Sequence, residues 1–204
     1  MAIINGTSGD DSLAGTSGTD TFSGGDGNDQ FTLNASDSAD GGFGDDTFTS
    51  AWGTTDKGTL TLHGGAGEDT FSISLSNTKQ GVYAYGADGQ DIFNVKGHGN
   101  ISLNGGAGDD SFWLTDVSSA TLTLGSGRDR VELLAQDTTP TVTITSRRPP
   151  SAEHNTIQQP VCRGTRLGVR DGRRHRACST PPRPSPESRR AREECREHGR
   201  GNRR

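Results

Sequence analysis

The sequence predicts an all-β protein folded as a parallel β-roll, a right-handed β-solenoid with two short strands in each coil. Three observations support this fold class. Only 27% of the 204 residues are hydrophobic, which is poor material for an ordinary globular core. Glycine is abundant, with 30 residues in the chain. A nine-residue pattern recurs from Gly6 to Val131, and a fixed period is the sequence signature of a repeat architecture.

Two compositions divide the chain. Residues 1–146 carry 20 Asp and Glu against 5 Lys and Arg, whereas residues 147–204 carry 6 against 16. This asymmetry predicts an acidic structured domain over 1–146 and a disordered tail, rich in Arg and Pro, over 147–204. All three cysteines (Cys162, Cys178 and Cys195) lie in the tail, so disulfides cannot hold the acidic domain together. No apolar run approaches the ~20 residues that span a bilayer.

Each copy of the pattern has glycine at positions 1 and 4, aspartate at position 6 and an apolar residue at position 8. Two adjoining copies begin at Gly6 and Gly15. The later copies begin at Gly24, Gly41, Gly64, Gly86 and Gly105, with a weaker one at Leu124. From Gly24 onward the copies start 17 to 23 residues apart, which is about two nonapeptides. One coil is therefore predicted to contain a loop, a strand, a turn and a second strand.

The two strands of a coil are marked by apolar residues that alternate with polar ones, a period that sends one set of side chains inward. After the loops, the expected inward pairs are Phe71/Ile73, Phe93/Val95, Phe112/Leu114 and Val131/Leu133. Between the loops they are Leu60/Leu62, Val82/Ala84, Ile101/Leu103 and Ala120/Leu122. Parallel stacking of the coils would bring the phenylalanines at position 8 into an internal ladder. Trp113, next to Phe112, is expected to face outward.

The start positions also assign the loops to edges of the roll. The loops that begin at residues 6, 24, 41, 64, 86, 105 and 124 differ by about one coil each and are expected to form one column. The loop that begins at Gly15 is half a coil out of step and is expected alone on the opposite edge. Glycines at positions 1, 2 and 4 permit positive φ angles that turn several carbonyl oxygens toward one point. Calcium takes six to eight such oxygen ligands.

The pattern resembles the RTX, or haemolysin-type, calcium-binding nonapeptide repeat, whose consensus is G-G-x-G-x-D-x-U-x with U a large apolar residue. The resemblance extends from residue 6 to about residue 145. It implies calcium ions held between loops of adjacent coils by aspartate carboxylates and glycine carbonyls. The aspartates carried over are Asp11, Asp20, Asp29, Asp46, Asp69, Asp91, Asp110 and Asp129. The glycines are Gly9, Gly25, Gly27, Gly42, Gly44, Gly65, Gly67, Gly89, Gly106 and Gly108.

Up to six inter-coil sites would follow, and we expect about five calcium ions. The doubtful site involves Asp129, because the cationic neighbours Arg128 and Arg130 should weaken calcium binding there.

Without metal, the excess carboxylates in residues 1–146 would repel one another, so the roll is expected to fold on binding calcium. The resemblance further implies export through type I secretion machinery and an extracellular location. Residues 1–6 lack the basic start and apolar stretch of a cleavable signal peptide.

Two functions fit these expectations. The first is a calcium-binding structural or interaction module of a secreted bacterial protein. The alternative is a non-catalytic fragment of an RTX enzyme, such as a protease, lipase or polysaccharide epimerase. The chain contains neither H-E-x-x-H nor G-x-S-x-G, so we expect no enzyme activity.

The tail leaves two interpretations open. It is either a genuine basic segment able to meet nucleic acid or acidic surfaces, or the translation of a shifted reading frame that begins where another glycine loop was due. Nucleic acid is not the partner we expect. His175, Cys178, Cys195 and His198 are ligand types that zinc uses, but their Pro- and Arg-rich surroundings do not favour a zinc site.

Overall fold

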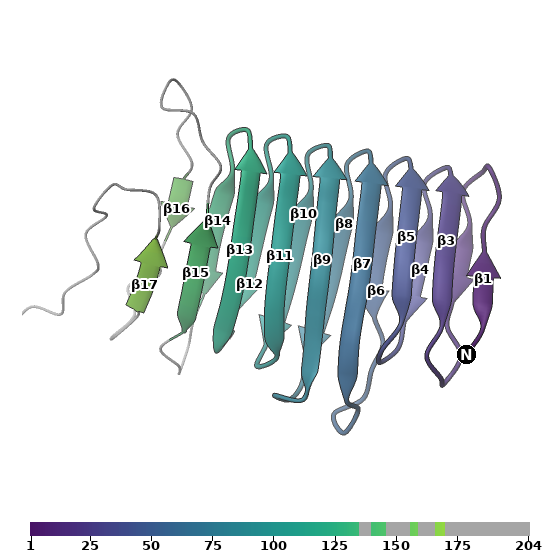
Figure 1. Ribbon diagram of the computed structural model, residues 1–204, viewed down its shortest axis with the longest axis horizontal. Coiled ribbons are helices and arrows are strands. Elements are labelled where there is room, and N and C mark those ends of the chain that lie inside the picture. The colour runs from purple at the N-terminus through teal and green to yellow at the C-terminus, as the bar shows by residue number, and fades with distance from the viewer. Residues whose placement is uncertain (135–139, 146–155, 159–165, 170–204) are drawn as a thin grey trace, which may run out of the picture.

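A computed structural model describes residues 1–134, 140–145, 156–158 and 166–169 (Figure 1). Every regular element in these residues is a β-strand, and the strands form two sheets. The nine-stranded sheet consists of β1 (Ile3–Asn5), β3 (Thr21–Asp26), β5 (Ser38–Phe43), β7 (Gly58–Ala66), β9 (Gln80–Asp88), β11 (Asn100–Ala107), β13 (Ser119–Ser126), β15 (Thr141–Thr145) and β17 (Arg166–Val169). The eight-stranded sheet consists of β2 (Ser12–Ala14), β4 (Gln30–Leu33), β6 (Thr47–Ser50), β8 (Thr70–Leu75), β10 (Ile92–Gly97), β12 (Ser111–Thr115), β14 (Arg130–Leu134) and β16 (Thr156–Gln158).

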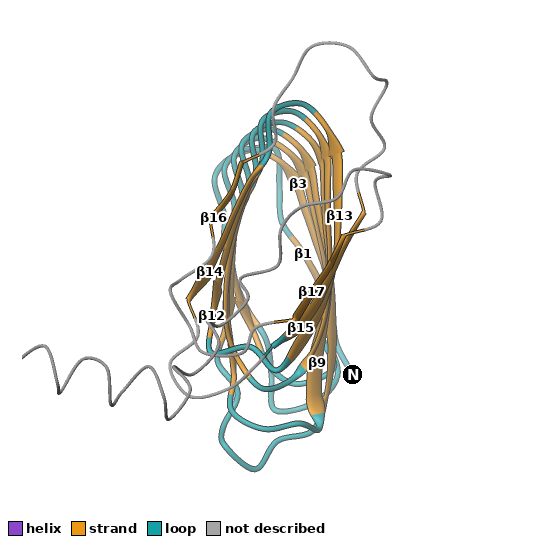
Figure 2. Cartoon of the chain, turned by 90° about the vertical axis from the view of Figure 1, so that its left-hand side faces the viewer, coloured by secondary structure: helices purple, strands orange, loops and turns teal. Residues whose placement is uncertain are grey.

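Successive strands alternate between the two sheets, and neighbours within a sheet pair in parallel. Each coil therefore contributes one strand to each sheet before the chain advances to the next coil. Figure 2 shows the two sheets facing one another across a thin interior. This arrangement confirms the all-β parallel β-solenoid with two strands per coil.

The core is a narrow apolar stripe between the sheets. Leu60 and Leu62 of β7 are fully buried and lie in register with Val82 and Ala84 of β9. All of the inward pairs expected from the sequence are buried. In the opposite sheet, five phenylalanine rings at position 8 stack face to face, with centroids 4.7–4.8 Å apart; they are Phe31, Phe48, Phe71, Phe93 and Phe112. The internal aromatic ladder is thus confirmed.

The chain crosses between the sheets along two edges, which we call the upper and lower edge after their places in Figure 1. Upper-edge loops lead from the nine-stranded sheet to the eight-stranded sheet, and lower-edge loops lead back. In the second to seventh coils the upper-edge loops have three residues each; they are 27–29, 44–46, 67–69, 89–91, 108–110 and 127–129. The loop that begins at Gly15 precedes β3 and lies on the lower edge, as the spacing predicted.

The lower edge is less regular. Residues 51–57 separate β6 from β7, whereas only residues 98–99 separate β10 from β11. In the longer loop, Trp52 is largely buried and its Nε1 donates a 2.8 Å hydrogen bond to the Ser74 carbonyl oxygen. Trp113 lies on the outer face of β12, as expected, with the Arg130 guanidinium carbon 4.7 Å from its ring centroid.

Most of the predicted tail lies outside the described residues, including all three cysteines and the four possible zinc ligands. Within residues 147–204 the structure describes two strands. β16 pairs in parallel with β14, and β17 pairs in parallel with β15, so each sheet gains one strand. The described part of the chain includes no helix long and apolar enough to cross a membrane.

Candidate metal centre

The position-6 aspartates of the upper edge form a continuous ladder. Its members are Asp11, Asp29, Asp46, Asp69, Asp91, Asp110 and Asp129. The backbone N–H of each aspartate donates to Oδ1 of the aspartate in the following coil, over 2.8 Å from Asp11 to Asp29 and 3.3 Å from Asp110 to Asp129. One carboxylate oxygen per coil therefore joins that coil to the preceding one.

The second carboxylate oxygen has a different environment. In five successive loops Oδ2 is buried and accepts no hydrogen bond; these are the loops of Asp29, Asp46, Asp69, Asp91 and Asp110. Buried polar atoms are nearly always hydrogen-bonded, because an unpartnered one bears the full cost of losing water. Five equivalent exceptions in one column are a property of the loop, and they point to a ligand that is not protein.

The unpartnered oxygen faces the backbone at position 1 of its own loop. A methyl group placed on Gly24 would overlap both Oδ2 of Asp29 and the carbonyl oxygen of Gly41 in the next coil. The same overlap with the loop's own Oδ2 occurs at Gly41, Gly64, Gly86 and Gly105. A side chain at position 1 would fill the space between the carboxylate and the carbonyl of the following coil. Glycine leaves this space open, so the two oxygens can share one partner.

Glycines at positions 2 and 4 let the loops stack closely. Gly42 and Gly65, both at position 2, have φ angles of 110° and 114°, and a methyl group on Gly65 would overlap the Gly42 carbonyl oxygen. Nine of the ten predicted ligand glycines share a positive φ: Gly25, Gly27, Gly42, Gly44, Gly65, Gly67, Gly89, Gly106 and Gly108. Gly9, in the first loop, does not. Ala87 occupies position 2 of the fifth loop with a φ of 85°, a conformation that disfavours a side chain.

Burial and mutual repulsion make these carboxylates weak acids. Loss of hydration, reinforced by neighbouring carboxylates, raises the pKa of Asp46 and of Asp91 to about 6. The same causes raise the pKa of Asp69 and of Asp110 to about 7. No three His, Cys, Asp or Glu side chains gather at one point in the described residues, so a cation at this edge would take most of its ligands from backbone carbonyls.

Asp11 and Asp20 differ from the other predicted ligands. Oδ2 of Asp11 accepts hydrogen bonds from the backbone N–H and the hydroxyl of Thr7. On the lower edge, Thr16 binds Oδ2 of Asp20 in the same way, and the Thr16 hydroxyl is the main cause that lowers the pKa of Asp20. The sequence did carry a signal for this difference, because position 2 is threonine in these two copies alone.

The lower edge holds a buried aspartate that the sequence analysis did not single out. Asp37 accepts the Asp20 N–H at Oδ1 (2.7 Å) and the Asn34 N–H at Oδ2 (2.6 Å). It continues a short aspartate ladder from Asp20, with both oxygens satisfied by protein. No glycine pattern surrounds Asp37, so no sequence signal marked it.

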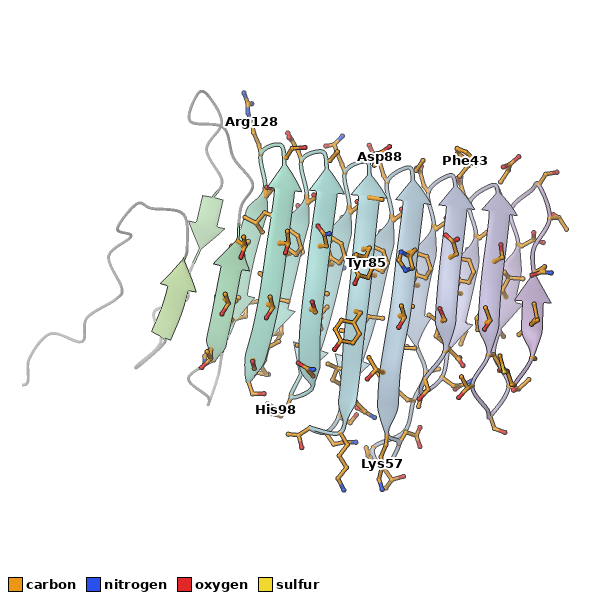
Figure 3. The ribbon with its side chains drawn as sticks, viewed as in Figure 1. Phe43, Lys57, Tyr85, Asp88, His98 and Arg128 are labelled. Carbon is orange, nitrogen blue, oxygen red and sulfur yellow. The ribbon has the colours of Figure 1, made fainter. Side chains whose placement is uncertain are left out.

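Asp129 ends the upper-edge column among the described residues. It is buried. Arg130 lies over Trp113 and its Nη2 is 3.0 Å from Oε2 of Glu132. Arg128 is exposed at the upper edge (Figure 3), and its backbone N–H donates to Oδ1 of Asp109. Both arginines therefore contribute positive charge near this loop.

A second row of side chains, which the sequence analysis also missed, runs along the outside of the same loops at position 5. We call it the outer ladder; its bonds run from Asn28 N–H to Asp10 Oδ1, from Asp45 N–H to Asn28 Oδ1, from Glu68 N–H to Asp45 Oδ1, and from Arg128 N–H to Asp109 Oδ1. In the outer ladder the acceptor lies in the preceding coil, whereas in the position-6 ladder the acceptor lies in the following coil. Where both ladders occur, they tie a coil to its neighbours in both directions.

The fold and this edge together define a repeat protein: a parallel β-solenoid in which one edge carries a column of glycine loops with buried aspartates. The sequence matches the RTX calcium-binding nonapeptide repeat in four copies, over residues 5–36, 61–72 and 102–115. In these segments the chain is similar to calcium-binding repeats of this family. No curated protein and no solved structure matches the chain.

Proposed function

We propose that this chain is a calcium-binding β-roll module of a secreted protein, with a structural or interaction role and no catalysis of its own. The observation that supports this most is the row of five buried Oδ2 atoms that accept no hydrogen bond. Each such atom costs roughly 1–3 kcal/mol or more when left unpartnered, and the cost is higher for a charged group. A cation at each loop would remove that cost in every coil at once.

The residues that would hold the ions are Asp29, Asp46, Asp69, Asp91 and Asp110, with carbonyls of the loop glycines. Each of these carboxylates faces a carbonyl of the following coil, which gives five inter-coil intervals. Bound calcium would supply positive charge to an all-oxygen cradle and neutralise the row of carboxylates. Magnesium suits this edge less well, because it demands near-ideal octahedral geometry and keeps several waters. Zinc prefers nitrogen and sulfur ligands.

Folding on calcium follows from the same electrostatics. Residues 1–146 carry 20 acidic side chains against 5 basic ones, and the fold places seven of the carboxylates in one ladder. In the absence of a cation this ladder opposes folding, since like charges repel more strongly where water is excluded. Extracellular calcium modules often work at about 10⁻⁴–10⁻³ M. The family resemblance then favours a chain that leaves the cell unfolded through type I secretion machinery and folds outside.

Far-UV circular dichroism of the full chain tests the proposal. The protein is stripped with EDTA and titrated with CaCl₂, and in parallel with MgCl₂. We expect a cooperative change from coil to β-structure with calcium, and little or none with magnesium at the same concentration. A spectrum that is already rich in β-structure in EDTA, or that stays coil-like at saturating calcium, would contradict calcium-dependent folding.

A further inference from the structure

We infer that the two N-terminal loops, at residues 6–11 and 15–20, are closed by threonine and hold no calcium, so that the calcium column begins in the second coil. This inference rests on the proposed calcium binding and specifies which loops carry it out. It narrows the ligand set that the family resemblance implies, because Asp11 and Asp20 then act as acceptors for protein donors.

The first loop is closed by Thr7. Its backbone N–H lies 2.5 Å, and its hydroxyl oxygen 2.9 Å, from Oδ2 of Asp11. The Thr7 hydroxyl also accepts the N–H of Gly9 at 3.3 Å, which fixes the rotamer that the carboxylate needs. The oxygen that is unpartnered in the next five upper-edge loops therefore has two donors here.

The lower-edge loop repeats this arrangement with Thr16. Its N–H and hydroxyl lie 2.6 Å and 2.7 Å from Oδ2 of Asp20, and its hydroxyl accepts the N–H of Gly18. Oδ1 of Asp20 accepts the N–H of Ala2 at 2.6 Å. Both oxygens of this buried carboxylate are thus engaged. An ion could reach Oδ2 of either aspartate only by breaking two charge-assisted hydrogen bonds, the stronger class of such bonds.

Sterics explain why threonine stands at position 2 only in these loops. A methyl group on Gly25 would overlap the Thr7 carbonyl oxygen, and one on Gly42 would overlap the Gly25 carbonyl oxygen. Every later upper-edge loop has a preceding coil whose carbonyl excludes a branched side chain. Thr7 and Thr16 lie in the first loop on their respective edges, and no coil precedes them among the described residues.

Closure of the first loop by threonine determines which coils hold ions. Oδ2 of Asp11 and the carbonyl oxygen of Gly24 flank the interval between the first and second coils. With Oδ2 of Asp11 bound by threonine, that interval takes no ion. The calcium column then begins at Asp29 and continues through Asp110.

Counting the bound ions tests the inference. Calcium per folded chain is measured by equilibrium dialysis for the wild-type full chain and for the variants Asp11→Asn, Asp20→Asn and Asp69→Asn. We expect Asp69→Asn to lose at least one ion, whereas Asp11→Asn and Asp20→Asn keep the wild-type number. Loss of an ion from Asp11→Asn or Asp20→Asn would overturn the inference. Failure of the wild-type chain to bind calcium would instead contradict the proposed function.

The variants Thr7→Val and Thr16→Val answer the same question if an asparagine variant does not fold. Valine keeps the shape of threonine and both carboxylates but removes the hydroxyl donor. We expect each valine variant to require a severalfold higher calcium concentration for half-maximal folding, at an unchanged number of ions. A calcium midpoint equal to that of the wild type in both variants would overturn the role of threonine.

Discussion

The backbone N–H of Asp46 donates a 2.9 Å hydrogen bond to Oδ1 of Asp69, while Oδ2 of Asp69 is buried without a hydrogen-bond partner. The two oxygens of one carboxylate therefore have different roles. Oδ1 joins neighbouring coils, and Oδ2 is the oxygen that a cation would neutralise under the proposed calcium binding. Stability and metal dependence can be separated by changing this single group.

Asp69→Asn should change stability in opposite directions with and without calcium. Asparagine retains an Oδ1 that accepts the Asp46 N–H, and it replaces the buried charge with a neutral amide that donates. In EDTA we expect the variant to be more stable than the wild type, because the unpartnered buried anion is gone. At saturating calcium we expect it to be less stable by about 1–3 kcal/mol, because one carboxylate ligand is lost. Urea unfolding measures the difference at saturating calcium, and the content of β-structure by circular dichroism measures the difference in EDTA.

Asp40→Asn is the matched control for that substitution. Asp40 lies on β5 and is exposed, so the same chemical change removes a charge that is outside the ladder, although its repulsion contributes to the raised pKa of Asp46. Its effect should stay within about 0.5 kcal/mol under both conditions. Equal effects of Asp40→Asn and Asp69→Asn would mean that net charge, and not the buried oxygen, governs calcium dependence.

The calcium-free roll should become more stable as pH falls. The pKa values of Asp46 and Asp91 are raised to about 6, and those of Asp69 and Asp110 to about 7, from an ordinary value of 3.8. Groups that bind protons more tightly when folded stabilise the fold fully below about pH 4 and lose that effect as pH rises through about 6 to 7. In EDTA we therefore expect more β-structure at about pH 5 than at about pH 8, measured by circular dichroism.

Calcium should weaken or reverse this pH dependence. The ion binds the ionised carboxylates, so protons compete with it over the same range. A calcium-free chain with more β-structure at about pH 8 than at about pH 5 would show that the ladder carboxylates do not control folding.

Phe71→Ala should damage the aromatic ladder at its centre. The Phe71 ring stacks on Phe48 and Phe93 with centroids 4.8 Å and 4.7 Å apart, and it is completely buried. Loss of a buried phenylalanine typically costs about 3–5 kcal/mol, because packing is lost and a cavity remains. Thermal unfolding at saturating calcium should show a large fall in Tm. Phe43→Ala is the control, since Phe43 is 67% exposed at the upper edge (Figure 3) and its truncation should change Tm little.

Ala87→Gly should stabilise the fifth loop. Ala87 has a φ of 85°, whereas position 2 is glycine in the second, third, fourth, sixth and seventh upper-edge loops. A side chain in this region costs of order 1–3 kcal/mol, of which the greater backbone entropy of glycine offsets part. We expect a net gain of about 1 kcal/mol at saturating calcium, measured by urea unfolding. The reverse change, Gly65→Ala, should destabilise the roll, and a stabilising Gly65→Ala would contradict this account.

Glu68→Asp should extend the outer ladder. Asp45 uses its short side chain to accept the Glu68 N–H at 2.7 Å, whereas Glu68 at the same position contacts only the Gln90 side chain of the next coil. Aspartate at position 68 would place Oδ1 near the Gln90 N–H and add one bond between coils. We expect a gain of about 0.5–1.5 kcal/mol at saturating calcium. Glu68→Gln, which keeps the longer side chain, should bring no comparable gain.

The repeat and its alternation were sufficient to predict the fold. Leu60, Leu62, Phe71 and Ile73 were assigned to the interior from period-two alternation alone, and all four are buried. The spacing also assigned the loop at Gly15 to the opposite edge. These predictions succeed because each coil contacts mainly its neighbours, so local periodicity determines the global arrangement.

The states of individual carboxylates could not be predicted in the same way. Asp11 and Asp29 occupy the same position of the repeat, yet one is bound by threonine and the other has an unpartnered oxygen. That difference depends on the backbone conformation at position 2 and on the carbonyl of the preceding coil. Asp37 escaped notice because its role comes from its register with Asp20 and not from any local pattern.

The contrast between the edges has a consequence for protein engineering. In the second to seventh coils the upper-edge loops keep three residues between strands, because one extra residue would shift an aspartate out of the column. The lower edge already accommodates connections as different as residues 51–57 and 98–99 in the same register. A foreign peptide grafted between Trp52 and Lys57 would therefore leave the column of aspartates in place, and under the proposed function its display would depend on calcium. For the same reason, insertions and deletions during evolution should be confined to the loops of the lower edge.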